Sequence, residues 1–63
     1  MNNESQAKML IRKLKDAIKN EQKERITALF DVAELIDWHE VHDSVFTQYD
    51  ALLDPANEVL LTT

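Results

Sequence analysis

The chain has 63 residues, a formal net charge of −5 at pH 7, and neither cysteine nor glycine. This length allows one domain at most, and domains this small bury only about 60% of the surface that the unfolded chain exposes. Without cysteine or glycine, the chain cannot form disulfides, thiolate metal sites, glycine-rich phosphate loops or most tight β-turns. The composition therefore predicts one all-α domain over residues 1–63, a small three-helix bundle or a helical hairpin, whose core is completed by homodimerisation.

The expected compartment is the cytoplasm, because a secreted domain of this size usually depends on disulfides. The first five residues are polar rather than basic, and no long apolar run follows them. We therefore expect no signal peptide, no membrane-spanning helix and no membrane partner.

The first helix is predicted over residues 5–20, with Asn3 or Ser5 as its N-terminal cap. Its apolar residues recur at steps of three and four, which places them on one side of a helix. They are Ala7, Leu10, Ile11, Leu14, Ala17 and Ile18. A basic stripe on another side consists of Lys8, Arg12, Lys15, Lys19 and Lys23. Glu21 then falls on the apolar side, which indicates either a short connection at residues 20–22 or a continuous helix that leaves the core.

The second helix is predicted over residues 23–36. Its apolar positions at helical spacing are Ile26, Leu29, Phe30, Ala33 and Ile36. Val32 and Leu35 widen this apolar arc to more than half of the helix circumference. A helix with so wide an apolar arc is expected to be largely buried.

The third helix is predicted over residues 38–53. Its narrower apolar stripe consists of Trp38, Val41, Val45, Tyr49 and Leu52, flanked by Phe46 and Leu53. Asp37 followed three positions later by Glu40 is typical of a capping pair, so a new helix is predicted to begin at this corner. The alternative is one long helix from 23 to 53 that bends near residue 37 without a break.

The end of the third helix is predicted at Asp54, because a proline disfavours the α conformation of the residue before it. Pro55 can also occupy the first position of a last short turn. The remaining tail, residues 54–63, ends in an apolar run that consists of Val59, Leu60 and Leu61. Two roles fit this run: it folds back to close the core, or it is offered to a partner.

The charges divide unevenly along the chain. Residues 1–30 hold seven basic and four acidic side chains (net +3), whereas residues 31–63 hold eight acidic side chains and no Lys or Arg (net −8). In one interpretation, the basic helix packs beside the acidic region, within one subunit or across a two-fold axis. In another, the acidic side of the third helix is a docking surface for a basic partner. Phosphate binding by the basic stripe fits poorly with a pI of about 4.7, so nucleic acid is an unexpected partner.

Residue types that occur in catalytic and metal sites crowd together between Asp37 and Asp43, where the sequence is D-W-H-E-V-H-D. His39 and Asp43 would share one side of a helix. However, His42 follows His39 by three positions, not by the four of the H-E-x-x-H zinc motif. Neither serine of the chain has a base at a suitable spacing. We therefore predict no enzymatic activity, no metal site and no cofactor.

The predicted function is that of a small adaptor, inhibitor or regulator that acts through protein–protein contacts, of the kind that bacteria, plasmids and phages encode. The acidic residues expected to face the partner are Glu40, Asp43, Asp50 and Asp54. The apolar contacts expected with a partner or a second copy are Trp38, Tyr49, Leu60 and Leu61. One alternative is a dimeric helical regulator that binds nucleic acid through Arg12, Lys15 and Lys19. Another is a structural subunit of a larger assembly.

Overall fold

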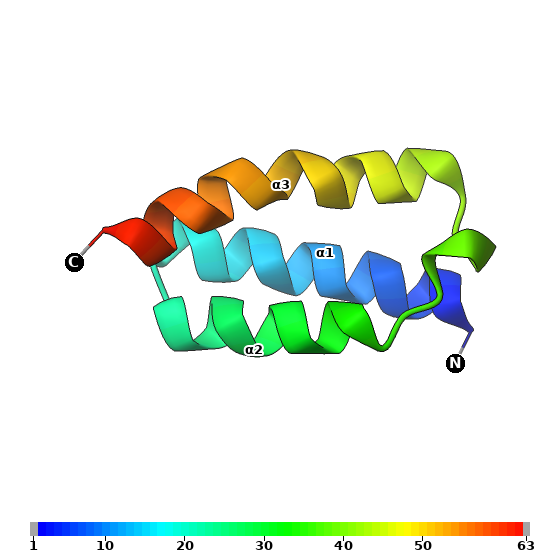
Figure 1. Ribbon diagram of the computed structural model, residues 1–63, viewed down its shortest axis with the longest axis horizontal. Helices are drawn as coiled ribbons and strands as arrows, with labels where there is room; N and C mark the ends of the chain where they lie inside the picture. Colours follow the sequence, from blue (N-terminus) through cyan, green and yellow to red (C-terminus); the bar gives the residue numbers. More distant parts are fainter. Residues whose placement is uncertain (1, 63) are drawn as a thin grey trace.

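A computed structural model describes residues 2–62, so Met1 and Thr63, the two ends of the predicted domain, lie outside the described residues. The described residues form three α-helices and one 3-10 turn, in the order α1 (Asn3–Lys19), α2 (Lys23–Glu34), η1 (Trp38–Glu40) and α3 (Asp43–Leu61). The helices alternate in direction along a bundle that measures 36 × 18 × 16 Å (Figure 1). The predicted all-α three-helix bundle is thus confirmed, and residues 2–62 contain no strand.

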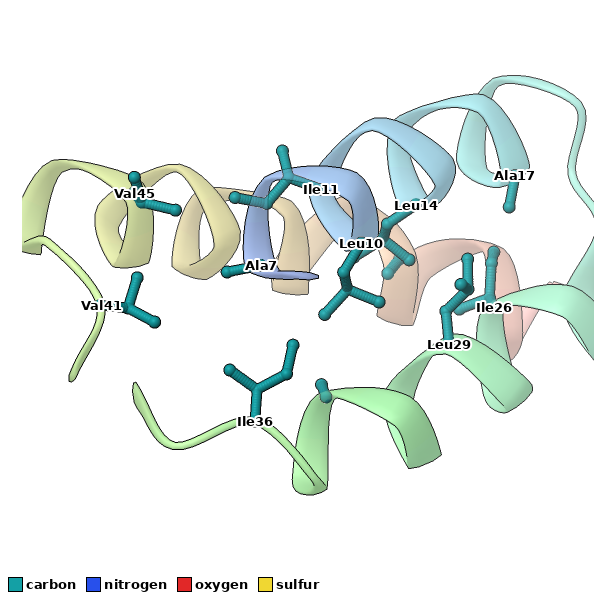
Figure 2. Packing of buried hydrophobic residues seen from close by; sticks show 12 residues of the cluster. Ala7, Leu10, Ile11, Leu14, Ala17, Ile26, Leu29, Ile36, Val41 and Val45 are labelled. Atoms are coloured by element: carbon teal, nitrogen blue, oxygen red, sulfur yellow. The ribbon is translucent and has the colours of Figure 1, made fainter. Parts of the chain in front are cut away.

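α1 is the central helix of the bundle. It packs extensively against both α2 and α3, whereas α2 and α3 have few contacts with each other. Figure 2 shows Leu10 of α1 on the side of Leu29 from α2, and Ile11 of α1 on the side of Val45 from α3. The twelve buried core residues are Ala7, Leu10, Ile11, Leu14, Ala17, Ile26, Leu29, Ala33, Ile36, Val41, Val45 and Ala56.

α1 begins two residues earlier than predicted. Asn2 caps it, rather than Asn3 or Ser5, because the side-chain oxygen of Asn2 accepts the N–H of Ser5 at 2.7 Å. This leaves Asn3 free to bind the chain between α2 and α3. Its Nδ2 donates to the Glu40 carboxylate at 2.6 Å, and its Oδ1 accepts the N–H of Asp37 at 3.3 Å. The first turn of α1 therefore holds η1 in place.

The connection between α1 and α2 contains a left-handed residue, Glu21, with a φ of 53°. The N–H of Glu21 donates to the carbonyl of Ile18 at 3.1 Å, and the N–H of Gln22 donates to the carbonyl of Ala17 at 2.9 Å. This is the hydrogen-bond pattern of a Schellman motif, in which glycine normally occupies the left-handed position. Of the two alternatives for residues 20–22, the short connection is the one found.

The chain between α2 and α3 breaks twice, so the predicted break near Asp37 is found but the predicted helix bounds on either side of it are wrong. The helix predicted over 23–36 ends at Glu34, the helix predicted over 38–53 begins only at Asp43, and no helix is continuous from 23 to 53. Ile36 and Val41, on either side of η1, are each only 6% exposed. Burying both of these side chains against α1 requires the chain to turn twice. Their burial therefore outweighs the helical propensity of the residues between them.

Two side chains cap the new elements after these breaks. The Asp37 carboxylate accepts the N–H of His39 at 3.1 Å, so the predicted cap residue starts a 3-10 turn rather than a helix. His42 caps α3 instead, because its Nδ1 accepts the N–H of Ser44 at 3.1 Å. The local capping signal at Asp37 is thus real, but the element that it starts is shorter than predicted.

α3 continues through Pro55, so the predicted helix end at Asp54 is wrong. A proline inside a helix lacks the N–H for one hydrogen bond and is about 3 kcal/mol less favourable than alanine. The continuation buries Ala56 completely and packs Val59 and Leu60 against the core. This apolar burial offsets the unfavourable free energy of the proline. Figure 1 shows that α3 curves along its length. The tail thus contributes to the core as a helix that continues α3.

Candidate functional site

Three aromatic side chains gather where η1 meets α3. The rings of Trp38 and Tyr49 stack, with centroids 4.6 Å apart and an interplanar angle of 22°. Phe46 meets Trp38 edge-on at a centroid distance of 5.6 Å. Such aromatic pairs contribute about 0.5–1.5 kcal/mol beyond the burial of their area. The indole N–H of Trp38 also donates to the carbonyl of Ala33 at 3.0 Å, so the tryptophan links η1 to α2.

A surface groove extends from these rings between α2 and α3. It exists because α2 and α3 both pack on α1 but have few contacts with each other. The groove has a volume of about 460 Å³. Its lining residues, which define the aromatic groove, are Phe30, Ala33, Glu34, Trp38, Tyr49, Leu53 and Asn57. Phe30, Trp38 and Tyr49 are only half-buried, so aromatic surface is exposed to solvent inside the groove.

The rim of the aromatic groove is acidic. Glu34 lines it from α2. On α3, Asp50 and Asp54 directly follow the lining residues Tyr49 and Leu53, and therefore project about 100° further round the helix. All three carboxylates belong to exposed residues, and residues 31–63 contain no Lys or Arg that would neutralise them. The groove thus combines an apolar floor with a negatively charged rim.

The phenol of Tyr49 responds to both features of the groove. Burial raises the pKa of Tyr49 above its ordinary value of 10.0, and the negative charge of Glu34 raises this pKa further. Both effects disfavour the phenolate, because it would be a charge in a less polar place and close to another negative charge. Tyr49 therefore stays a neutral phenol at physiological pH.

The four acidic residues predicted to face a partner do not lie on one helix. Asp43, Asp50 and Asp54 are exposed residues of α3, on the side of the helix opposite Val45 and Ala56. Glu58 follows Asp54 at helical spacing and is also exposed, although the prediction omits it. We call these four residues of α3, Asp43, Asp50, Asp54 and Glu58, the acidic side of α3. Glu40 lies in η1 instead, where its carboxylate accepts a hydrogen bond from the first turn of α1.

The predicted apolar contacts separate into two places. Trp38 and Tyr49 come together in the aromatic groove. Leu60 packs half-buried against the core, and Leu61 is 82% exposed at the end of α3. Only the first pair therefore forms a concave surface.

Five lining residues of the groove are missing from the sequence-based prediction of the site, namely Phe30, Ala33, Glu34, Leu53 and Asn57. Their spacing is the signal that the sequence offers. Phe30 and Glu34 are four residues apart on α2, and Tyr49, Leu53 and Asn57 follow one another at the same interval on α3. Such intervals place residues along one side of a helix, but they do not show that the two sides flank one groove.

The basic residues that would bind nucleic acid in the alternative prediction lie on the outer surface of α1. Arg12, Lys15 and Lys19 are all exposed. They belong to a shallow hollow of about 490 Å³ that is lined by Arg12, Lys13, Lys15, Asp16, Lys19 and Arg25. We call this the basic hollow. It contains Lys13 and Arg25 in addition to the three predicted basic residues, and it shares no lining residue with the aromatic groove.

The cluster between Asp37 and Asp43 is divided by the turn. His39 lies in η1 and Asp43 begins α3, so the two residues do not share one side of a helix. Within residues 2–62, no group of three His, Cys, Asp or Glu side chains is placed to hold a metal ion. Among the helices of the same residues, none combines the length and the apolar character needed to cross a membrane.

Comparison with known proteins finds no match among family models, curated proteins or solved structures. The function is therefore inferred from the bundle and the surfaces of the chain itself.

Proposed function

We propose that this protein is a small adaptor, inhibitor or regulator that acts without catalysis, by binding a segment of a partner protein in the aromatic groove. The observation that carries the proposal is the stacked pair of Trp38 and Tyr49, which lines an open groove. Aromatic side chains in pockets commonly contribute most of the binding energy of protein interfaces. A groove between two helices is also a recurrent acceptor for an amphipathic helix.

The proposed partner segment is an amphipathic helix with a broad apolar side and with Lys or Arg beside it. Its apolar side chains would cover the floor of the groove, and its cations would meet the rim carboxylates Glu34, Asp50 and Asp54. Charge complementarity of this kind accelerates association and disfavours acidic competitors. The acidic rim should therefore control the association rate, and the aromatic floor the dissociation rate.

We further propose that the protein acts in the cytoplasm as a homodimer. Pairing is supported by the small size of the domain and by five large hydrophobic side chains that are at least 40% exposed in the described residues. The compartment is supported by the cysteine-free composition, because small secreted domains commonly rely on disulfides.

The single tryptophan of the chain, Trp38, makes groove binding directly measurable. The probes are two synthetic helical peptides with the same pattern of leucines, one with lysines and the other with glutamates on the polar side. We expect the lysine peptide to change the Trp38 fluorescence saturably and to protect this side chain from a soluble quencher. The glutamate peptide should do neither, because the acidic rim repels it.

A charge-reversal pair tests the rim. Asp50→Lys with Asp54→Lys should weaken binding of the lysine peptide at least tenfold, about 1.4 kcal/mol. Glu21→Lys with Glu24→Lys, two exposed positions outside the groove lining, in the turn before α2 and in its first turn, makes the same change of net charge and should retain most of the affinity. Equal losses in both double variants, or amide shifts in NMR that avoid the groove, would contradict the proposal.

Nucleic-acid binding by the basic hollow is the second candidate, favoured by the cations that gather there. The test is the affinity for a labelled DNA duplex and a labelled single-stranded RNA at several salt concentrations. A true site should lose affinity steeply as salt rises, since bound cations release counterions from the phosphates. It should also lose binding when Arg12, Lys15 and Lys19 are all replaced by alanine. Binding that survives this triple substitution would remove the candidate.

A further inference from the structure

α2 carries more apolar surface than the bundle covers. The sequence predicts this helix as largely buried, yet Val32 is 45% exposed, and Leu35, directly after its last residue, is 83% exposed. Met9 of α1 is 40% exposed and, together with Val32 and Leu35, lines a hollow between α1 and α2. We call Met9, Val32 and Leu35 the α1/α2 patch. The prediction of a buried helix is thus wrong for one side of α2.

The α1/α2 patch lies over a hollow of about 220 Å³ between α1 and α2. Leu10, Leu29 and Ile36 form the base of this hollow, and all three belong to the buried core. The patch is therefore an outward extension of the core rather than a set of isolated side chains. Lys13 is the one charged residue among the described residues that line the hollow. A lysine can lay its aliphatic stem along apolar surface while its ammonium group stays in water.

We propose that a second copy of this chain covers the α1/α2 patch through a two-fold symmetric interface. The inference rests on the proposed homodimer and assigns the surface that forms it. In a two-fold interface the same residues meet from both copies. A surface that pairs with itself should therefore be apolar and nearly free of one dominant sign of charge, which is the composition of the patch.

The other candidate surfaces do not meet this condition. Pairing through the acidic side of α3 or the rim of the aromatic groove would oppose carboxylates, and residues 31–63 contain no Lys or Arg to compensate them. Pairing through the basic hollow would oppose lysines and arginines from both copies. Like charges brought together across an interface are strongly unfavourable. Charge therefore directs self-association to the α1/α2 patch.

This arrangement leaves the aromatic groove accessible. Phe30 and Glu34 line the groove from α2, whereas Val32 and Leu35 form the patch. Helical periodicity places the two pairs on different sides of α2. The interface then joins α1 and α2 of both copies into a layer of four helices. The dimer presents two open grooves, so it can hold two partner segments at once and gain avidity towards an oligomeric partner.

Sedimentation equilibrium of the full chain and two variants tests the assignment. Leu35→Lys places a charge in the patch. Leu61→Lys makes the same change outside the patch, at a leucine that is 82% exposed and that the sequence also predicts as a contact with a second copy. We expect the wild-type chain to dimerise, Leu35→Lys to raise the dimer dissociation constant at least tenfold, and Leu61→Lys to behave as wild type. Both side chains project from the bundle, so circular dichroism should show unchanged helix content in each variant.

Three outcomes would overturn the inference, and they can be told apart. A wild-type chain that stays monomeric up to about 1 mM, a dissociation constant that corresponds to only about 4 kcal/mol, would refute both the homodimer and its surface. A dimer that survives Leu35→Lys but dissociates with Phe46→Lys would place the interface at the aromatic rings of Trp38, Phe46 and Tyr49 instead. Saturation at one lysine peptide per two chains would show that pairing closes the groove.

Discussion

At the scale of single residues, Glu21 shows most clearly how the composition of the chain leads to an unfavourable backbone conformation. The chain has no glycine, so the left-handed position after α1 is filled by a residue with a Cβ atom. That conformation is about 1–2 kcal/mol less favourable for such a residue. The Schellman hydrogen bonds of Glu21 and Gln22 nevertheless hold the turn. The motif is thus specified by the helices that it joins rather than by the residue at its centre.

Replacing Glu21 with glycine should therefore stabilise the protein. Glu21→Gly is expected to raise the free energy of unfolding by about 1 kcal/mol, and Tm by about 4–8 °C. The gain is reduced by the greater freedom of glycine in the unfolded chain. Thermal and urea unfolding measure the change. Glu24→Gly, within α2, is the control and should instead destabilise the chain by about 0.5–1 kcal/mol; a loss in both variants would refute the strain at Glu21.

Because of Tyr49, the protein should lose part of its stability at alkaline pH. Burial first, and the Glu34 carboxylate second, raise the pKa of Tyr49 above 10.0, so the folded chain holds the phenolic proton more tightly than the unfolded chain. This contribution is fully present below the unfolded pKa and is lost as pH rises through the higher folded pKa. The chain has a single tyrosine, so ultraviolet absorbance should show one titration, with its midpoint above 10.0.

Removing the charge of Glu34 separates the two causes. Glu34→Gln should lower the pKa of Tyr49 without restoring the ordinary value, because burial is the larger cause. Asp31→Asn removes the same charge from an exposed position outside the groove lining and should leave the titration unchanged. Identical titrations of wild type and Glu34→Gln would show that the carboxylate does not act on the phenol.

At the scale of elements, Pro55 is a position where core packing requires a helix although proline disfavours one. α3 passes through it because Ala56, Val59 and Leu60 reach the core only if the helix continues. Pro55→Ala should restore an N–H donor to the helix and raise the free energy of unfolding by about 2 kcal/mol, since part of the gain of about 3 is lost to unfolded-chain entropy. Asn57→Ala is the matched control, with an expected gain below about 0.7 kcal/mol. Equal gains in both variants would mean that Pro55 does not disturb α3.

The sequence predicts where the helices lie better than it predicts where they begin and end. Helical periodicity identified all three helices, because spacing at three and four residues depends only on helix geometry. The boundaries near Asp37 and Asp54 were predicted wrongly, because capping pairs and X–Pro steps are local signals. The burial of Ile36, Val41 and Ala56 is a tertiary effect, and it overrode both signals.

At the scale of the whole molecule, the candidate functional surfaces depend on how the helices are placed. Trp38 and Tyr49 could be selected as contact residues because large aromatic side chains are typical of interfaces. The aromatic groove could not be predicted, because it exists only where α2 and α3 stand apart on α1. The exposed side of α2 was missed for a related reason: the width of an apolar arc does not tell whether neighbours within one chain can cover all of it.

The acidic side of α3 lowers the stability of the isolated bundle, and in the proposed function it favours a basic partner. Asp50, Asp54 and Glu58 follow one another at intervals of four residues and are all exposed. Like charges at this spacing destabilise a helix by about 0.2–0.5 kcal/mol for each pair. Asp54 takes part in both pairs. A surface that opposes local stability in this way is typical of a functional site.

Reversing the charge of Asp54 should therefore improve stability and impair binding in the same variant. Asp54→Lys turns two repulsive pairs into attractive ones, so the free energy of unfolding should rise by about 1 kcal/mol at low salt, and the gain should shrink as salt screens the charges. Asp16→Lys makes the same change of net charge beside the cations of the basic hollow, and should destabilise the chain instead. The lysine peptide should bind Asp54→Lys more weakly than Asp16→Lys. If Asp54→Lys is more stable and binds the peptide as well as wild type, the acidic side of α3 has no part in recognition, and the aromatic floor alone must account for it.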